Sequence, residues 1–331
     1  MRIRSDCVQP IARLPQSQHT LIGRLARCVA RGLAMLWLVL PAVHAQQALQ
    51  VFTCEPEWAA LIKALHPSVK VFSATHAGQD PHDIEARPAL ISALRRADFA
   101  VCTGAGLEAG WLPTLQQRAG NPRVMPGRPG MIFAADGLSL IADAHHHTAR
   151  DKGHVHAEGN PHFHLDPRRL IPVAERISEH LARADPVHAR EYRTRLESWR
   201  NDWTQQIERW QQQAKPLFGL AVIAEHSSFA YLFRWLDLYQ TADLEPVPGV
   251  PPTISHLQTL LDRGRQDPPV AIIQTLYQNP QAGRWLSEKL AVPALQLPST
   301  VTAEGASSEL TGLFDDLIKR LLGVIPRRSE R

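Results

Sequence analysis

The sequence has no apolar run long enough to cross a membrane as a helix, and it contains only four cysteines in 331 residues. The apolar run at residues 33–43 follows six arginines and precedes the small residue Ala45. A basic flank, a short apolar core and a small residue at the cut site are typical of a cleaved secretory signal. We therefore predict a signal peptide over residues 1–45 and an exported, periplasmic protein. Arg27 directly before Cys28 argues against lipoprotein processing.

Without that leader, the chain also lacks an excess of either charge. The full sequence has a formal net charge of +4. Residues 1–45 hold six arginines and one aspartate, which leaves 30 basic and 31 acidic residues in the remainder. A nearly neutral chain offers no broad basic surface, so the composition argues against binding to nucleic acid.

Two cysteines, Cys54 and Cys102, remain after export, and each ends an apolar run. In an oxidising compartment two thiols can pair, whereas burial as two separate small apolar side chains is the alternative. We favour a disulfide between them.

Strand-like and helix-like segments alternate along the exported chain, which predicts an α/β fold with parallel sheets and helical crossovers. Four strand–helix units precede one long helical segment, and four follow it. Strands are expected at residues 49–54, 69–74, 97–103, near 124, 217–224, 238–244, 270–274 and 294–297. Helices are expected at residues 56–65, 89–96, 104–117, 167–183, 186–213, 280–290 and 307–322, with others ending at 236 and starting at 255.

This repetition predicts two lobes, each a mainly parallel four-stranded sheet flanked by helices, joined by a long rigid helix. The predicted boundaries are residues 46–185 for the N-terminal lobe, 186–215 for the linking helix and 216–331 for the C-terminal lobe. Three tryptophans recur on the linking helix at spacings of four and seven, which places their indoles on one face. They are Trp199, Trp203 and Trp210. We interpret this face as a packing surface and not as a ligand site.

The stretch from residue 143 to 167 is rich in histidine, a ligand that suits zinc and its neighbours among the transition metals. Residues 144–158 show no apolar periodicity, which predicts a polar loop. His162 instead stands between a Gly-Asn-Pro turn and a helix start at Asp166-Pro167. We therefore expect His162 to be a fixed ligand and the loop to bind metal weakly; a solvated loop without metal is the alternative. The loop histidines are His145, His146, His147, His154 and His156.

Histidines also follow two of the predicted strands. His82 and His226 each come after an apolar strand, and His162 follows the rigid turn. In parallel α/β sheets, the loops at the carboxyl ends of strands converge on the ligand crevice. A single histidine is more often a polar surface residue, but three at comparable positions in two lobes predict one shared metal site.

Four motifs resemble those of the zinc/manganese-binding receptors of bacterial ABC importers, and together they run through nearly the whole exported chain. They are Gln79-Asp-Pro-His82-Asp with Arg87-Pro88, Cys102-Thr-Gly-Ala-Gly-Leu-Glu108, Gly159-Asn-Pro-His162-x-His-Leu-Asp-Pro167 and Glu225-His226-Ser-Ser-Phe. The resemblance implies two α/β lobes, a linking helix and a metal between the lobes. His82 and His162 would be ligands from the first lobe and His226 from the second.

The same resemblance implies partners and a branch of the family. The partner would be an ABC permease in the inner membrane, with a periplasmic metallochaperone as a further candidate. The histidine-rich loop is typical of the zinc-specific branch. We expect the protein to act as a monomer.

The sequence departs from that family at two positions. His164 stands where the family usually has tryptophan, and Leu297-Pro298-Ser299 lacks the aspartate that the family often uses as a fourth ligand. Because manganese favours oxygen-rich sites, loss of that oxygen favours Zn(II) over Mn(II). We expect water as the fourth donor, with a loop histidine, His164 or Glu225 as the alternatives.

Other functions fit parts of the sequence. A zinc-dependent hydrolase would match His162-Phe-His164-Leu-Asp166, but Pro167 stands where that signature needs another histidine, and no HExxH motif occurs. A periplasmic zinc buffer or metallochaperone would share the metal site without a permease. A sugar or peptide receptor would need aromatic side chains and arginine around the cleft. We therefore expect a non-enzymatic, high-affinity zinc-binding protein that delivers Zn(II) to an importer.

Overall fold

The structure is a computed structural model that describes residues 48–142 and 158–325. The predicted signal peptide and the five loop histidines His145, His146, His147, His154 and His156 lie outside the described residues. The chain from Ala48 onward forms one compact unit. Among the residues described, no helix combines the length and the apolar character needed to cross a lipid bilayer.

The first sheet has four parallel strands in the order β2-β1-β3-β4. They are β1 (Gln50–Thr53), β2 (Lys70–Ser73), β3 (Phe99–Cys102) and β4 (Met131–Phe133). The central strand β3 is buried along its whole length, which explains its uninterrupted apolar sequence, since helices cover a parallel sheet on both faces. Its helices are α2 (Pro56–Leu65), α3 (Pro88–Arg96), α4 (Leu112–Ala119) and α5 (Leu170–Ala184).

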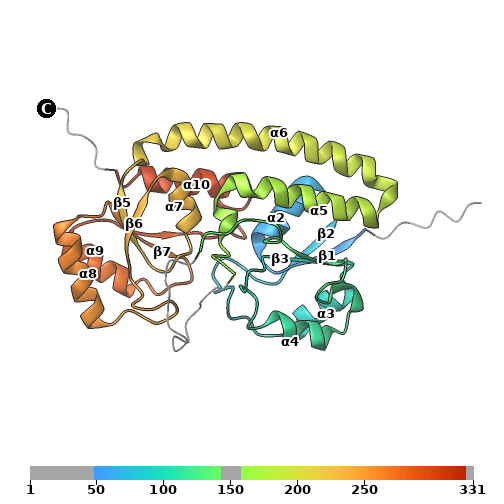
Figure 1. Ribbon diagram of the computed structural model, residues 1–331, viewed down its shortest axis with the longest axis horizontal. Coiled ribbons are helices and arrows are strands. Elements are labelled where there is room, and N and C mark those ends of the chain that lie inside the picture. The colour runs from blue at the N-terminus through green and yellow to red at the C-terminus, as the bar shows by residue number, and fades with distance from the viewer. Residues whose placement is uncertain (1–47, 143–157, 326–331) are drawn as a thin grey trace, which may run out of the picture. The chain divides into compact units, whose positions relative to one another are not determined.

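The second sheet repeats this topology, with four parallel strands in the order β6-β5-β7-β8. They are β5 (Ala221–Ala224), β6 (Tyr239–Asp243), β7 (Ala271–Thr275) and β8 (Ala294–Leu297). The helices that follow are α7 (Ala230–Leu236), α8 (Ile254–Gln266), α9 (Gln281–Leu290) and α10 (Leu310–Leu322). We call β1–β4 with α2–α5 the first lobe and β5–β8 with α7–α10 the second lobe. The two groups of strands are seen apart in Figure 1, and the predicted fold class is confirmed.

The long helix α6 (Ala189–Ala214) has 26 residues, and a 3-10 turn continues it at each end. It packs against α5 of the first lobe and α10 of the second (Figure 1). Trp203 and Trp210 are buried on its inner face, where both rings lie against Phe314. The indole N–H of Trp203 donates to the carbonyl of Pro167 at 2.8 Å. The tryptophan face is therefore a packing surface, as the sequence predicted.

Two expectations for the first lobe are wrong in detail. Residues 122–124 form a 3-10 turn, and the fourth strand begins only at Met131. Pro122 has no N–H for a ladder, and Asn121 caps the turn by accepting from the N–H of Arg123. The helix expected from residue 104 begins at Leu112, because positive φ angles at residues 104–106 are incompatible with a helix.

Cys54 and Cys102 form a disulfide between the ends of β1 and β3. These strands are neighbours in the sheet, and the two Cα atoms lie 4.7 Å apart. Both side chains are fully buried in the apolar cluster beneath α3 and α4. The pairing favoured from the sequence is therefore present in the structure.

Candidate metal centre

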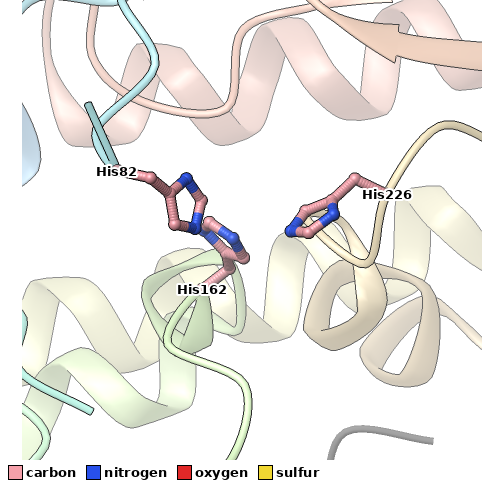
Figure 2. Close-up of side chains that lie close together, drawn as sticks. All are labelled: His82, His162 and His226. Atoms are coloured by element: carbon pink, nitrogen blue, oxygen red, sulfur yellow. The ribbon is translucent and has the colours of Figure 1, made fainter. Parts of the chain in front are cut away.

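Three segments bring His82, His162 and His226 together. His82 lies in the loop after β2, His162 directly precedes a 3-10 turn at residues 163–165, and His226 comes two residues after β5. One ring nitrogen from each histidine lies within 4.8 Å of the others. Figure 2 shows the three rings reaching toward a common centre from separate stretches of backbone. We call these residues the histidine triad.

The histidine triad is buried as well as compact. The centres of the rings lie 5.7 Å apart for His82–His162, 5.7 Å for His82–His226 and 5.9 Å for His162–His226. No more than 8% of any of the three residues is exposed. Three imidazoles buried this close together form a group that could hold a metal ion.

Carboxylates orient two of the triad rings. Nδ1 of His82 lies 2.6 Å from a carboxylate oxygen of Asp80, and Nδ1 of His226 lies 3.0 Å from one of Glu245. A carboxylate at Nδ1 selects the tautomer with the proton on that nitrogen, which directs the lone pair of Nε2 to a metal. Histidines that bind metals in proteins usually donate their other ring N–H to such a carboxylate.

The backbone at His226 has an unusual conformation. Its φ angle is +65°, in the left-handed region that residues other than glycine seldom adopt. The carboxylate of Asp243 accepts hydrogen bonds from the N–H groups of His226 and Glu245, both at 2.9 Å, and so fixes this turn. Such conformations concentrate at functional sites, where the surrounding structure holds them in place.

His164 lies beside the triad, but its nitrogens face other groups. Its ring centre is 6.4 Å from that of His162. Nε2 lies 2.8 Å from the carbonyl oxygen of Ser299 in the second lobe, and Nδ1 lies 3.4 Å from a carboxylate oxygen of Glu57. At the position where the resembling family usually has tryptophan, this chain therefore has a histidine that links the two lobes.

Glu225, the other side chain considered as a fourth donor, is also turned toward other partners. Its carboxylate accepts a hydrogen bond from the amide of Gln274. Burial raises the pKa of Glu225 to about 7. Among the described residues, neither Glu225 nor His164 belongs to the group of potential ligand atoms that the triad forms.

Several residues that support the triad were not singled out from the sequence. Asp80 lies within the motif around His82, where its spacing of two residues could have indicated a partner for that ring. No sequence pattern pointed to Asp243 or Glu245. They reach His226 only because β6 pairs with β5 in the folded sheet. The loop histidines and the signal peptide lie outside the described residues.

The two parallel sheets, the long helix and the triad between the lobes are the architecture of a solute-binding protein with a candidate metal site. The chain belongs to the family described as zinc-uptake complex component A, periplasmic, whose sequence model matches residues 51–322.

Named relatives are about a quarter identical to this chain over the residues that match. The zinc-binding protein AdcA of Streptococcus pyogenes serotype M3 is 25% identical over 202 residues, which are 56% of this chain and 37% of AdcA. The high-affinity zinc uptake system protein ZnuA of Yersinia pestis is 23% identical over 194 residues, 55% of this chain and 61% of ZnuA. The chain thus matches little more than a third of the length of AdcA.

Solved structures show the same fold. A crystal structure of ZnuA superposes with a TM-score of 0.70 at 20% sequence identity, covering 84% of this chain and 99% of the other. A manganese-bound periplasmic metal-binding protein from Candidatus Liberibacter asiaticus gives a TM-score of 0.67 at 16% identity, covering 83% of this chain and 99% of the other.

Proposed function

We propose that this protein is a periplasmic receptor that captures Zn(II) between its two lobes and delivers it to an ABC import permease. The observation that carries the proposal is the histidine triad, which is buried and draws ligands from both lobes. A metal ion held by both lobes orders the loops around the triad, and a permease can then distinguish the loaded protein from the empty one. The proposed ligands are His82, His162 and His226.

Zinc is the proposed ion because the triad offers nitrogen and no carboxylate oxygen. Zn(II) accepts three imidazoles and one further ligand in a tetrahedral site, whereas Mn(II) favours oxygen-rich sites. Asp80 and Glu245 contact the ring nitrogens and so act through the histidines. We propose water as the fourth ligand, because His164 and Glu225 are engaged elsewhere.

Metal analysis of the protein purified without a histidine tag tests this proposal. We expect one tightly bound zinc per chain when residues 144–157 have been removed. Competition titration with Zn(II) and Mn(II) should show a clear preference for zinc. Tighter binding of manganese, or no tight site at all, would contradict the proposal.

The proposed permease separates a receptor from a periplasmic zinc buffer, which would share the metal site. The zinc-loaded protein is expected to bind its permease more tightly than the metal-free protein does. Measurement of both affinities with the purified permease in detergent checks this, and equal or absent binding would favour the buffer.

The proposed location rests on the sequence of the first 45 residues. We propose cleavage after Ala45 and release without a lipid anchor, since Arg27 precedes Cys28. N-terminal sequencing of the exported protein checks the cut site.

A further inference from the structure

Asn160, in the turn before His162, hydrogen-bonds to both lobes. Its side chain is almost completely buried, with 1% of the residue exposed. The carbonyl oxygen Oδ1 accepts from the backbone N–H of His162 at 2.9 Å. The amide nitrogen Nδ2 donates to the backbone carbonyl of Ser227, also at 2.9 Å, and Ser227 directly follows His226. One carboxamide therefore connects the backbone beside two histidines of the triad.

A second bond joins the lobes at the same place. The hydroxyl of Tyr231, at the start of α7 in the second lobe, donates to the backbone carbonyl of Asn160 at 3.0 Å. It accepts from the backbone N–H of Ile141 at 2.8 Å. Tyr231 is 1% exposed, and the guanidinium carbon of Arg169 lies 4.7 Å from its ring centre. A hydroxyl from one lobe is thus fixed by two backbone groups of the other.

The backbone around Asn160, which forms the first-lobe side of these bonds, is held by neighbouring residues. The N–H of Asn160 donates to the carbonyl of Ile141 at 2.9 Å, so the two segments lie side by side. Gly159 has a φ angle of +107°, and a Cβ there would approach that of Leu140 to 2.7 Å. Glycine is therefore required for the segments to come this close. The backbone of Asn160, to which Tyr231 bonds, is therefore held in place by the first lobe.

We propose that Asn160 and Tyr231 are positioning residues of the metal site, which fix the separation of His162 from His226 across the two lobes and slow the release of bound metal. This inference rests on the proposed function, since it concerns the same site. A zinc–imidazole bond is about 2.0–2.1 Å long, and a shift of about 0.5 Å in one ligand already weakens a site. Because the ligands come from two lobes, release requires the segments around the triad to separate locally, and the two bridging groups then lose their buried hydrogen bonds.

The experiment compares Tyr231→Phe and Asn160→Ala with the wild-type chain and with Tyr192→Phe. Tyr192 is a matched control, because it is also buried but its hydroxyl donates to Asp185, outside the site. Zn(II) release to a chelator is followed by stopped flow, and the melting temperature is measured with and without zinc. The visible spectrum of the Co(II)-loaded protein reports the ligand geometry.

We expect Tyr231→Phe to release zinc at least about tenfold faster than the wild type, because it removes both buried hydrogen bonds of the hydroxyl to the first lobe. Asn160→Ala removes one bond to the second lobe and one to the backbone of His162, and it should also release zinc faster than the wild type. In both variants zinc should raise the melting temperature less than in the wild type, and the cobalt bands should shift or weaken. Tyr192→Phe should lose stability without any change in release or spectrum.

The outcomes separate this inference from the proposed function. A wild-type chain that binds neither Zn(II) nor Co(II) tightly would overturn the proposed function. Tight binding by the wild type together with unchanged release from Tyr231→Phe would leave that function standing and overturn the positioning role. If metal-free Tyr231→Phe is less stable but releases zinc at the wild-type rate, Tyr231 stabilises the fold and does not position the metal site. If Asn160→Ala does not fold, Tyr231→Phe alone decides.

Discussion

At the scale of single residues, two of the three triad imidazoles already have one ring nitrogen engaged by a carboxylate. Asp80 and Glu245 each contact Nδ1 of a triad histidine. This arrangement fixes the rings before any metal arrives, so the ordering of the side chains costs little when the metal binds.

Replacement of any one of the triad residues His82, His162 and His226 by alanine should weaken zinc binding more than about 100-fold, because a zinc ion with only two protein ligands is poorly held. Competition titration against a chelator of known affinity measures the change. His180→Ala is the control, since this histidine lies on α5 outside the triad. A variant with wild-type affinity would show that its residue is not a ligand.

Loss of the carboxylates that contact the rings, Asp80 and Glu245, should weaken zinc binding less than loss of a ligand does, but by a measurable amount. We expect Asp80→Asn and Glu245→Gln each to weaken zinc binding by about 10- to 100-fold, since an amide orients the ring without lending it negative charge. The same titration measures the effect, with the exposed Glu158→Gln as the control. Equal affinity in all three variants would mean that the carboxylates are structural.

Two further carboxyl groups, Glu55 and Glu108, make stability depend on pH. Both accept from the N–H of Thr103, at 3.2 and 2.6 Å. Burial raises the pKa of Glu108 to about 7, and burial together with Glu108 raises that of Glu55 well above its ordinary value. A carboxyl group whose pKa is raised by folding stabilises the protein below its unfolded pKa, and this contribution is lost as the pH rises through the folded value.

We therefore expect the contribution of Glu108 to the free energy of unfolding of the metal-free protein to fall between about pH 4.5 and pH 7, so that the slopes of stability against pH differ between the wild type and Glu108→Gln in this range. Urea denaturation at a series of pH values measures both slopes. An unchanged slope in the variant would show that Glu108 does not titrate in this range.

At the scale of elements, two of the triad histidines, His82 and His226, lie in loops that follow strands. His226 follows β5, the Asp243 carboxylate at the end of β6 fixes its backbone, and Glu245 comes two residues later. Because β5 and β6 are parallel neighbours, their carboxyl ends bring these three residues to one edge of the sheet. A register shift in this pair would separate the ring from its carboxylate.

The histidine-rich segment can be tested as one element, by deletion. The described residues on either side of it are already adjacent, since the N–H of Asn160 bonds to the carbonyl of Ile141. Deletion of residues 144–157 should therefore preserve the fold and leave the tightest zinc affinity nearly unchanged. The number of zinc ions bound per chain should fall, as measured by metal analysis at saturating zinc. A large loss of the tightest binding would show that the segment supplies a ligand to the main site.

At the scale of the whole molecule, the two lobes share one apolar core. Residues of β1, α2 and α5 from the first lobe and of β5, α7 and α10 from the second belong to a single buried cluster, together with α6. Tightly packed interiors resist gradual deformation. Wide opening of the lobes would have to break this core, so metal entry is expected to involve the loops around the triad.

We expect zinc to raise the melting temperature of the protein while its radius of gyration changes by less than about 1 Å, as in binding proteins with preformed sites. Small-angle X-ray scattering with and without zinc measures the second quantity. A contraction of several ångströms would show that the lobes swing widely despite their common core.

The sequence by itself determined the order of the elements, because period, turn residues and apolar runs are local properties of the chain. Helix α2 begins and ends at the predicted residues, and the strands β1 and β3 with the cysteines at their ends follow the same pattern. The sequence also proposed His82, His162 and His226 from their positions after strands and turns. It failed at β4, where the turns around residues 122–130 decide which short apolar run becomes the strand.

Only the tertiary structure decided which groups meet across the two lobes. Asn160 and Ser227 are 67 residues apart, and His164 and Ser299 are 135 apart, so no local pattern could pair them. The same holds for Glu245, which reaches His226 only through the pairing of two parallel strands. Hydrogen bonds of this kind depend on the packing of complete lobes around a shared core, and that packing is a property of the folded chain as a whole.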